Sequence, residues 1–154
     1  MYPDTYQNKE NDVAVYWFSS PFDPLNNWSA HVVIVEGVLF YTLEHAYHHQ
    51  KFIENNADIA EQIRLAPSPW AAMKFARENS QLCRSDWDDM KVDFMEKLVR
   101  LKLAQNEDVQ ETLARTGTRR IVENSPWDSF WGVGSDGKGK NMMGQIWMKV
   151  RDGK

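Results

Sequence analysis

The sequence predicts an α+β fold, namely a single, mostly helical domain with a small β-sheet. Its 154 residues match the size of one compact domain, which buries enough apolar surface to fold without cross-links. From about residue 43 onward apolar residues recur with helical period, whereas the β-rich runs before that point are short. We expect residues 1–12 to form a polar tail and residues 13–154 to form the domain.

Four short β-rich runs predict the strands, at residues 13–18, 32–36, 38–42 and 120–123. Gly37 separates the second run from the third, which favours a hairpin or a bulge between them. Residues 19–28 contain prolines and asparagines, so we expect a loop before the hairpin.

Capping residues indicate where the helices begin and end. Thr42 can cap a helix that runs to about residue 55. Ser68 followed by Pro69 is typical of a helix start, because proline suits the first helical position. Gly117 is expected to end a short helix. The expected helices cover residues 42–55, 58–65, 69–78, 85–105, 108–115 and 141–151, with a glycine-rich loop at 125–140.

Composition narrows the class of protein. The formal net charge of −4 disfavours non-specific binding to nucleic acid, which needs many phosphate contacts. Cys83 is the only cysteine, which suits a reducing compartment, and no apolar run has the length of a membrane span. We therefore expect a cytoplasmic protein without a membrane partner.

The strongest candidate for chemistry is the predicted helix that begins near residue 43. Glu44, Tyr47, His48 and Lys51 have the spacing i, i+3, i+4 and i+7, which places them on one helix face. Glu44 and Lys51 are then about 10 Å apart along the axis, so long side chains can converge on one ligand. The alternative is a solvated face with an ordinary charge pair, and the spacing alone favours that alternative.

The three histidines of this helix also raise the question of a metal site. His45 and His49 are four residues apart, as are Glu44 and His48. The run lacks the glutamate of the zinc-protease pattern His-Glu-x-x-His, and no cysteine–histidine pair elsewhere completes a site. We expect neither a metal nor a cofactor.

Two segments near the end of the chain suit a nucleotide-like ligand. Residues 127–134 combine aromatic rings and Asp128 with glycines, which favours stacking on a base, or equally a loop whose aromatics fill the core. Residues 137–144 place lysines and glycines before a helix, a pattern typical of a backbone phosphate nest or of a surface loop. Asn26 and Asn27 could bind sugar hydroxyls, although turn formation is the simpler interpretation.

Taken together, these segments resemble the NADAR family of YbiA-like domains over roughly residues 16–151. One departure is that His48 and His49 stand where the family commonly has Gln-Ala. The resemblance rests on Leu25-Asn26-Asn27-Trp28, Glu44-His45 with Lys51-Phe52, Trp87, Thr116-Gly117, Asp128-x-x-Trp131-Gly132, Gly137-Lys138-Gly139-Lys140-Asn141-x-x-Gly144 and Met148-x-x-Arg151.

The resemblance implies an N-glycosidase that hydrolyses the bond between a base and C1′ of ribose. One branch of the family acts on ribosylaminopyrimidine phosphates of riboflavin synthesis, and the single-domain length and the Gly-Lys-Gly-Lys-Asn stretch favour this branch. Another branch removes ADP-ribose from guanine in DNA, and a third possibility is a module that binds ADP-ribose or a nucleotide without cleaving it. The expected partner is a small ribosyl or nucleotide substrate, or else ADP-ribosylated nucleic acid.

The resemblance also implies roles for individual residues. Glu44 would stabilise the positive charge that builds on ribose and direct water to C1′, by analogy with O-glycosidases. Lys51 would hold a phosphate or the ring-opened aldehyde, or form a Schiff base with that aldehyde. The expected catalytic residues are thus Glu44 and Lys51, and the expected substrate-binding residues are Asn27, His48, Trp87, Asp128, Trp131, Gly132, Lys138, Lys140 and Asn141.

Overall fold

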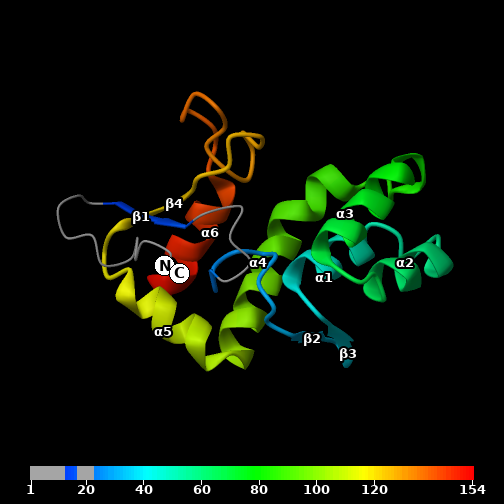
Figure 1. Cartoon of the computed structure of the whole chain (residues 1–154), viewed down its shortest axis with the longest axis horizontal. Coiled ribbons are helices and arrows are strands. Elements are labelled where there is room, and N and C mark those ends of the chain that lie inside the picture. The colour runs from blue at the N-terminus through cyan, green and yellow to red at the C-terminus, as the bar shows by residue number, and fades with distance from the viewer. Residues whose placement is uncertain (1–12, 17–22) are drawn as a thin grey trace. The chain divides into compact units, whose positions relative to one another are not determined.

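The computed structural model describes residues 13–16 and 23–154, the first four by their backbone alone (Figure 1). Helices dominate, and the expected α+β class is confirmed. The elements in order are β1 (Val13–Tyr16), β2 (Val33–Val35), β3 (Val38–Phe40), α1 (Leu43–Gln50), α2 (Ala57–Arg64), α3 (Pro69–Glu78), a 3₁₀ turn (Ser80–Leu82), α4 (Trp87–Gln105), α5 (Glu107–Arg115), β4 (Arg120–Glu123) and α6 (Met142–Arg151).

The chain divides into two compact units, and each has its own pair of strands. One unit combines Met1–Ser29 with Asn106–Lys154, and the other is Ala30–Gln105. The strands form two two-stranded sheets, where the sequence had predicted one small sheet. In the part of the chain that the structure describes, no helix is long and apolar enough to cross a membrane.

In the first unit, β4 pairs with β1 in parallel and packs against α6. Trp147 of α6 is fully buried, and its indole N–H donates to the carbonyl of Leu25 at 3.2 Å. Gly144 lets the helix approach the strand, because a Cβ at this position would collide with the carbonyl of Ile121. This close approach fixes where the glycine-rich loop before α6 must return to β4.

The second unit joins a hairpin to helices α1–α4. Glu36 and Gly37 form the turn of the antiparallel β2–β3 hairpin, and both have positive φ, at 51° and 83°. That pair of angles is typical of a type I′ turn, in which glycine is favoured. Phe52 packs with small and aliphatic side chains of α2 and α3, so the chain that leaves α1 turns directly into a core.

Most expected helix starts are confirmed, whereas α1 is shorter than expected. The Ser68 side chain accepts the N–H of Ala71 at 3.0 Å, and α3 covers the predicted residues. Helix α1 begins after Thr42 as predicted but ends at Gln50, not near residue 55. The N–H groups of Lys51 and Phe52 bond to carbonyls three residues earlier, which tightens the chain into a turn as Phe52 enters the core. Lys51 is the C-cap of α1 and still has right-handed helical backbone angles, with φ −62° and ψ −23°.

Candidate functional site

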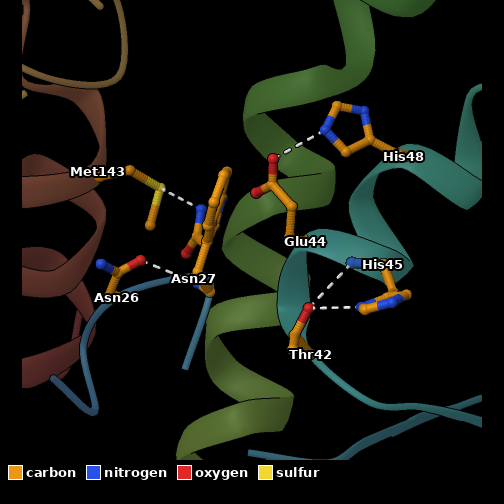
Figure 2. Close-up of polar contacts among 8 residues, drawn as sticks. Asn26, Asn27, Thr42, Glu44, His45, His48 and Met143 are labelled. Atoms are coloured by element: carbon orange, nitrogen blue, oxygen red, sulfur yellow. Dashed lines mark hydrogen bonds and ion pairs between the residues drawn. The ribbon is translucent and has the colours of Figure 1, made fainter. Parts of the chain in front are cut away.

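The start of α1 is fixed by Thr42 and His45 (Figure 2). The Thr42 hydroxyl accepts the backbone N–H of His45 at 3.2 Å and lies 2.7 Å from its Nδ1. His45 Nε2 lies 3.0 Å from the carbonyl of Ala66, so this nitrogen donates and Nδ1 accepts the hydroxyl hydrogen. Burial lowers the pKa of His45 and keeps it neutral. Because both ring nitrogens are engaged within the chain, His45 is a structural residue that aligns the helix.

Glu44 and His48 form a buried pair one helical turn apart (Figure 2). Nε2 of His48 lies 2.8 Å from Oε1 of Glu44, and the two residues are only 5% and 9% exposed. Burial lowers the pKa of His48, although the nearby carboxylate of Glu44 opposes the shift. A neutral imidazole therefore donates Nε2–H to the Glu44 carboxylate. The face predicted from the i, i+4 spacing thus exists and is buried, so it is not a solvated charge pair.

Lys51 ends this face as the residue that caps α1. Its Nζ lies 5.1 Å from the centre of the Tyr47 ring and 5.6 Å from that of Trp87. Burial lowers the pKa of Lys51, Glu44 raises it, and the positive charge of Arg77 adds to the lowering. A lysine with a lowered pKa has a larger neutral fraction, which is the form that attacks a carbonyl carbon. The surroundings of Lys51 thus suit a nucleophilic amine.

Trp87 forms a wall beside Lys51, with most of its ring covered by other side chains. It packs edge-to-face on Tyr47 with ring centres 5.0 Å apart and on Phe94 at 6.2 Å. The residue is 8% exposed, so little of the indole is left for stacking on a base. The structure therefore places Trp87 beside the Lys51 amine, and a contact of this ring with substrate stays a prediction.

The glycine-rich loop uses its backbone N–H groups internally. The expected phosphate nest needs N–H groups that point at a ligand, whereas these N–H groups already donate to carbonyls of the same loop. A phosphate at this loop would therefore have to be held by side chains. The bonds run from Gly139 to Val133 at 2.7 Å, Lys140 to Ser129 at 2.8 Å, Asn141 to Gly132 at 2.9 Å, and Met142 to Phe130 and Met143 to Trp131 at 3.0 Å.

Asn141 joins the loop to strand β4 through its side chain. Its Oδ1 accepts the N–H of Glu123 at 2.8 Å, and its Nδ2 donates to the carbonyl of Ile121 at 2.9 Å. The residue has a φ of 51°, a left-handed conformation that asparagine tolerates. Asn141 was predicted to bind substrate, but its carboxamide already holds the strand, so its geometry is that of a structural residue.

Asp128 and Gly132 shape the same loop. One oxygen of Asp128 accepts the N–H groups of Phe130 and Trp131 at 2.9 and 2.8 Å. A Cβ on Gly132 would lie 2.9 Å from the carbonyl of Asp128, so only glycine fits without movement. Both residues therefore bend the loop, and a contact of either with substrate stays a prediction.

Three other predicted binding residues of the first unit differ in exposure. Lys138 and Lys140 are exposed, and the Lys140 ammonium lies 5.3 Å from the centre of the Phe130 ring. Asn27 is half-buried, and its Nδ2 lies 3.6 Å from the sulfur of Met143 (Figure 2). Asn26, in contrast, accepts the N–H of Trp28 at 2.9 Å, so the turn interpretation is right for that residue.

The residues gathered by α1 therefore belong to one unit, and those of the loop belong to the other. Glu44, His48, Lys51 and Trp87 lie within Ala30–Gln105. Within the ranges that the structure describes, no three His, Cys, Asp or Glu side chains gather as metal ligands would. The predicted binding residues of the other unit are Asn27, Asp128, Trp131, Gly132, Lys138, Lys140 and Asn141.

Arg77 is a candidate that the sequence did not reveal. Its charge lowers the pKa of both His48 and Lys51, so the guanidinium acts on the face of α1 from helix α3. It lines a shallow cavity of about 370 Å³ together with Trp70, Lys74 and two other residues of α3. The only signal in the sequence was the helical spacing of Trp70, Lys74 and Arg77, which does not tell which helix they face.

Comparison with known proteins places these features in a family. The model of the NADAR domain matches residues 6–153. The chain is 34% identical over 143 residues to N-glycosidase Npun_R5314 of Nostoc punctiforme, covering 91% of this chain and 92% of that protein. It is 32% identical over 140 residues to N-glycosidase YbiA of Escherichia coli, covering 91% of this chain and 86% of that protein.

Two further comparisons concern the fold and a longer relative. The NMR structure of E. coli YbiA matches with a TM-score of 0.79 and 32% identity, covering 90% of this chain and 83% of that one. Riboflavin biosynthesis protein VVA0006 of Vibrio vulnificus is 37% identical over 120 residues, covering 78% of this chain and 32% of that protein.

Proposed function

Because this chain belongs to the NADAR family and is an N-glycosidase, we propose that it hydrolyses the C1′–N bond between the base and the ribose of a ribosylaminopyrimidine phosphate. The name of the Vibrio relative, a riboflavin biosynthesis protein, supports this substrate class. The observation that carries the proposal is the buried Glu44–His48 pair beside a lysine with a lowered pKa. A protein that only binds a nucleotide does not need such a combination.

Glu44 is the proposed residue for charge stabilisation and proton transfer. When the C1′–N bond breaks, its electron pair stays with the base, and positive charge develops on C1′ and the ring oxygen. A carboxylate in a water-poor site stabilises that charge strongly. Glu44 then takes a proton from the water that attacks C1′ and passes it to the nitrogen of the departing base.

In the alternative route, through a ring-opened substrate, Lys51 is the proposed nucleophile. A ribosylamine opens readily, and the neutral Lys51 amine adds to C1′ of the open form. The amine of the base leaves with a proton, and water then hydrolyses the lysine imine and releases the sugar phosphate. The lowered pKa of Lys51 supports this route, because imine formation requires the uncharged amine.

The remaining contacts are proposed residue by residue. We propose that the ammonium groups of Lys138 and Lys140 bind the phosphate of the substrate, since both side chains are exposed. We propose that Trp131 and Asn27, both half-buried, contact the base or the ribose. Their test is an increase in KM after replacement by alanine, with little change in kcat.

The deciding experiment offers two substrates in parallel. The protein is incubated with a ribosylaminopyrimidine phosphate and, separately, with ADP-ribosylated DNA, and released pyrimidine or ADP-ribose is measured by mass spectrometry. We expect release of the pyrimidine, and the Glu44→Gln variant serves as the inactive control. Release of ADP-ribose from the DNA alone would assign the chain to the DNA-directed branch. If the wild type released neither the pyrimidine nor ADP-ribose, the protein would be a binding module.

A further inference from the structure

His48 contains a buried nitrogen without a hydrogen-bond partner. The residue is 5% exposed, and Nδ1 makes no hydrogen bond to any residue that the structure describes. The opposite nitrogen, Nε2, lies 2.8 Å from Glu44. On the same helix both ring nitrogens of His45 have hydrogen-bond partners. Burial of a histidine in α1 therefore does not by itself leave a nitrogen without a partner. Native proteins rarely leave such groups unpaired, and the exceptions call for a functional explanation.

The neighbours of the ring determine which nitrogen carries the proton. Burial disfavours the imidazolium and Glu44 favours it, while Lys51 from the end of α1 and Arg77 from α3 disfavour it again. Tyr47 covers the ring edge-to-face at 5.1 Å, and Lys91 of α4 adds a positive charge beside Lys51. The neutral form therefore dominates near pH 7. Because a carboxylate only accepts hydrogen bonds, the hydrogen lies on Nε2, and Nδ1 presents a lone pair.

We propose that His48 is both a positioning residue for Glu44 and an acceptor for the substrate. Nε2–H holds the Glu44 carboxylate in one orientation (Figure 2), and Nδ1 accepts a hydrogen bond from a hydroxyl or amino group of the bound substrate. This inference rests on the proposed function, because it assigns a second role at the same site. The acceptor at Nδ1 would also distinguish this chain from other members of the family, in which glutamine is common at this position.

Two substitutions separate the two nitrogens. Asparagine carries its carboxamide at about the position of Nδ1, so His48→Asn keeps an acceptor there and loses the donor to Glu44. Glutamine reaches about as far as Nε2, so His48→Gln keeps the donor and loses the acceptor at Nδ1. His49→Gln is the matched control, because His49 is the next residue on α1 and its ring packs on Phe40. Thermal unfolding of each variant checks that it is folded.

The two variants should differ in which kinetic constant changes. We expect His48→Asn to lower kcat about tenfold or more with a small change in KM, because the buried Glu44 carboxylate loses its hydrogen-bond donor. We expect His48→Gln to raise KM about tenfold with kcat nearly unchanged, because one substrate hydrogen bond is lost. His49→Gln should change neither constant. If both variants matched the wild type in a preparation that turns over substrate, His48 would have no role in the reaction.

The pH profile supplies a readout that a purely structural role would not change. Protonation at Nδ1 converts the acceptor into a donor, so kcat/KM of the wild type should fall as the pH drops through the lowered pKa of His48. His48→Gln should lose this limb and keep only the limb that the Lys51 amine contributes, whereas His49→Gln should keep both. Persistence of the same limb in His48→Gln would show that another group titrates and would overturn the acceptor role.

Nitrogen-15 NMR of the protein without substrate tests the inference independently of turnover. We expect the His48 signals of the Nε2–H tautomer at pH 7, with Nδ1 unprotonated. A protonated Nδ1 at that pH would overturn the proposal even in a fully active enzyme. If the wild type released no base from either substrate, the proposed function would fail, and the tautomer would still report on the Glu44–His48 contact.

Discussion

Helix α1 and the glycine-rich loop both carry polar residues that the sequence marks as site residues, and they use them in opposite ways. In α1, Nδ1 of His48 has no hydrogen-bond partner among the described residues, and the Lys51 amine lies against aromatic rings. In the loop, the carboxamide of Asn141 and one oxygen of Asp128 bond to backbone of the same unit. In the first region reactive groups can still bind a ligand, whereas in the second the polar groups stabilise the backbone of the loop.

The hydrogen bonds of a buried polar side chain distinguish a residue that can bind a ligand from one that supports the backbone. An unpaired buried polar group costs about 1–3 kcal/mol, so a fold keeps one only where something else offsets that cost. A ligand donor at Nδ1 of His48 would offset it. Asn141 shows the reverse case, because its burial is matched by two hydrogen bonds inside the chain.

Replacement of Glu44 by glutamine should have the largest effect on activity. The carboxamide can still accept the hydrogen bond from His48, but it carries no charge to stabilise C1′ and takes no proton from water. We expect kcat to fall by about 10²- to 10⁴-fold, with little change in thermal stability. Steady-state kinetics and a melting curve on the same sample check both parts. Near-normal turnover would show that Glu44 supports the structure and takes no part in the reaction.

Replacement of Lys51 by arginine tests the amine next. Arginine keeps the positive charge but cannot form an imine, so we expect kcat to fall by about 10²-fold if the imine route operates. Borohydride trapping with substrate should add the mass of the reduced sugar adduct to wild type at Lys51 and not to this variant. Absence of an adduct in the wild type would leave Lys51 as a binding residue.

Borohydride trapping of the Lys51 adduct should become weaker as the pH falls. Only the neutral amine adds to C1′ of the open form, so adduct formation should decrease as the pH falls through the pKa of Lys51. Because burial lowers that pKa, the decrease should begin at a lower pH than for an ordinary lysine. Lys154, which is exposed, is the control for labelling outside the site.

Replacement of Asn141 by glycine tests the opposite side of the comparison. Glycine adopts the positive φ without strain, so the change removes only the two side-chain hydrogen bonds to β4. We expect a loss of about 2–3 kcal/mol in the free energy of unfolding, measured with denaturant. Asn124→Ala, at an exposed position, should change stability little. Unchanged stability with lost substrate binding would instead make Asn141 a ligand contact, as the sequence suggested.

How far the sequence could predict these roles depends on the range of the interactions involved. The face of α1 and the start of α3 follow from local spacing and capping, and both are present in the structure. The different states of His45 and His48 were not predictable, because the partner of His45 Nε2 is a carbonyl 21 residues away. The backbone hydrogen bonds of the loop were not predictable for the same reason, since its N–H groups pair with carbonyls that local patterns do not identify.

Replacement of Arg77 by alanine should give the smallest effect and tests whether the reactive region extends to α3. The charge of Arg77 helps to lower the pKa of Lys51, so its removal should raise that pKa. The acid limb of adduct formation should then move to higher pH by about half a unit, since an exposed charge contributes less than about 1 kcal/mol. Lys74→Ala is the control, because it removes a positive charge from the same cavity on α3, one turn before Arg77. An equal shift in both variants would indicate a general loss of positive charge, whereas a shift in Arg77→Ala alone would add Arg77 to the groups that tune the Lys51 amine.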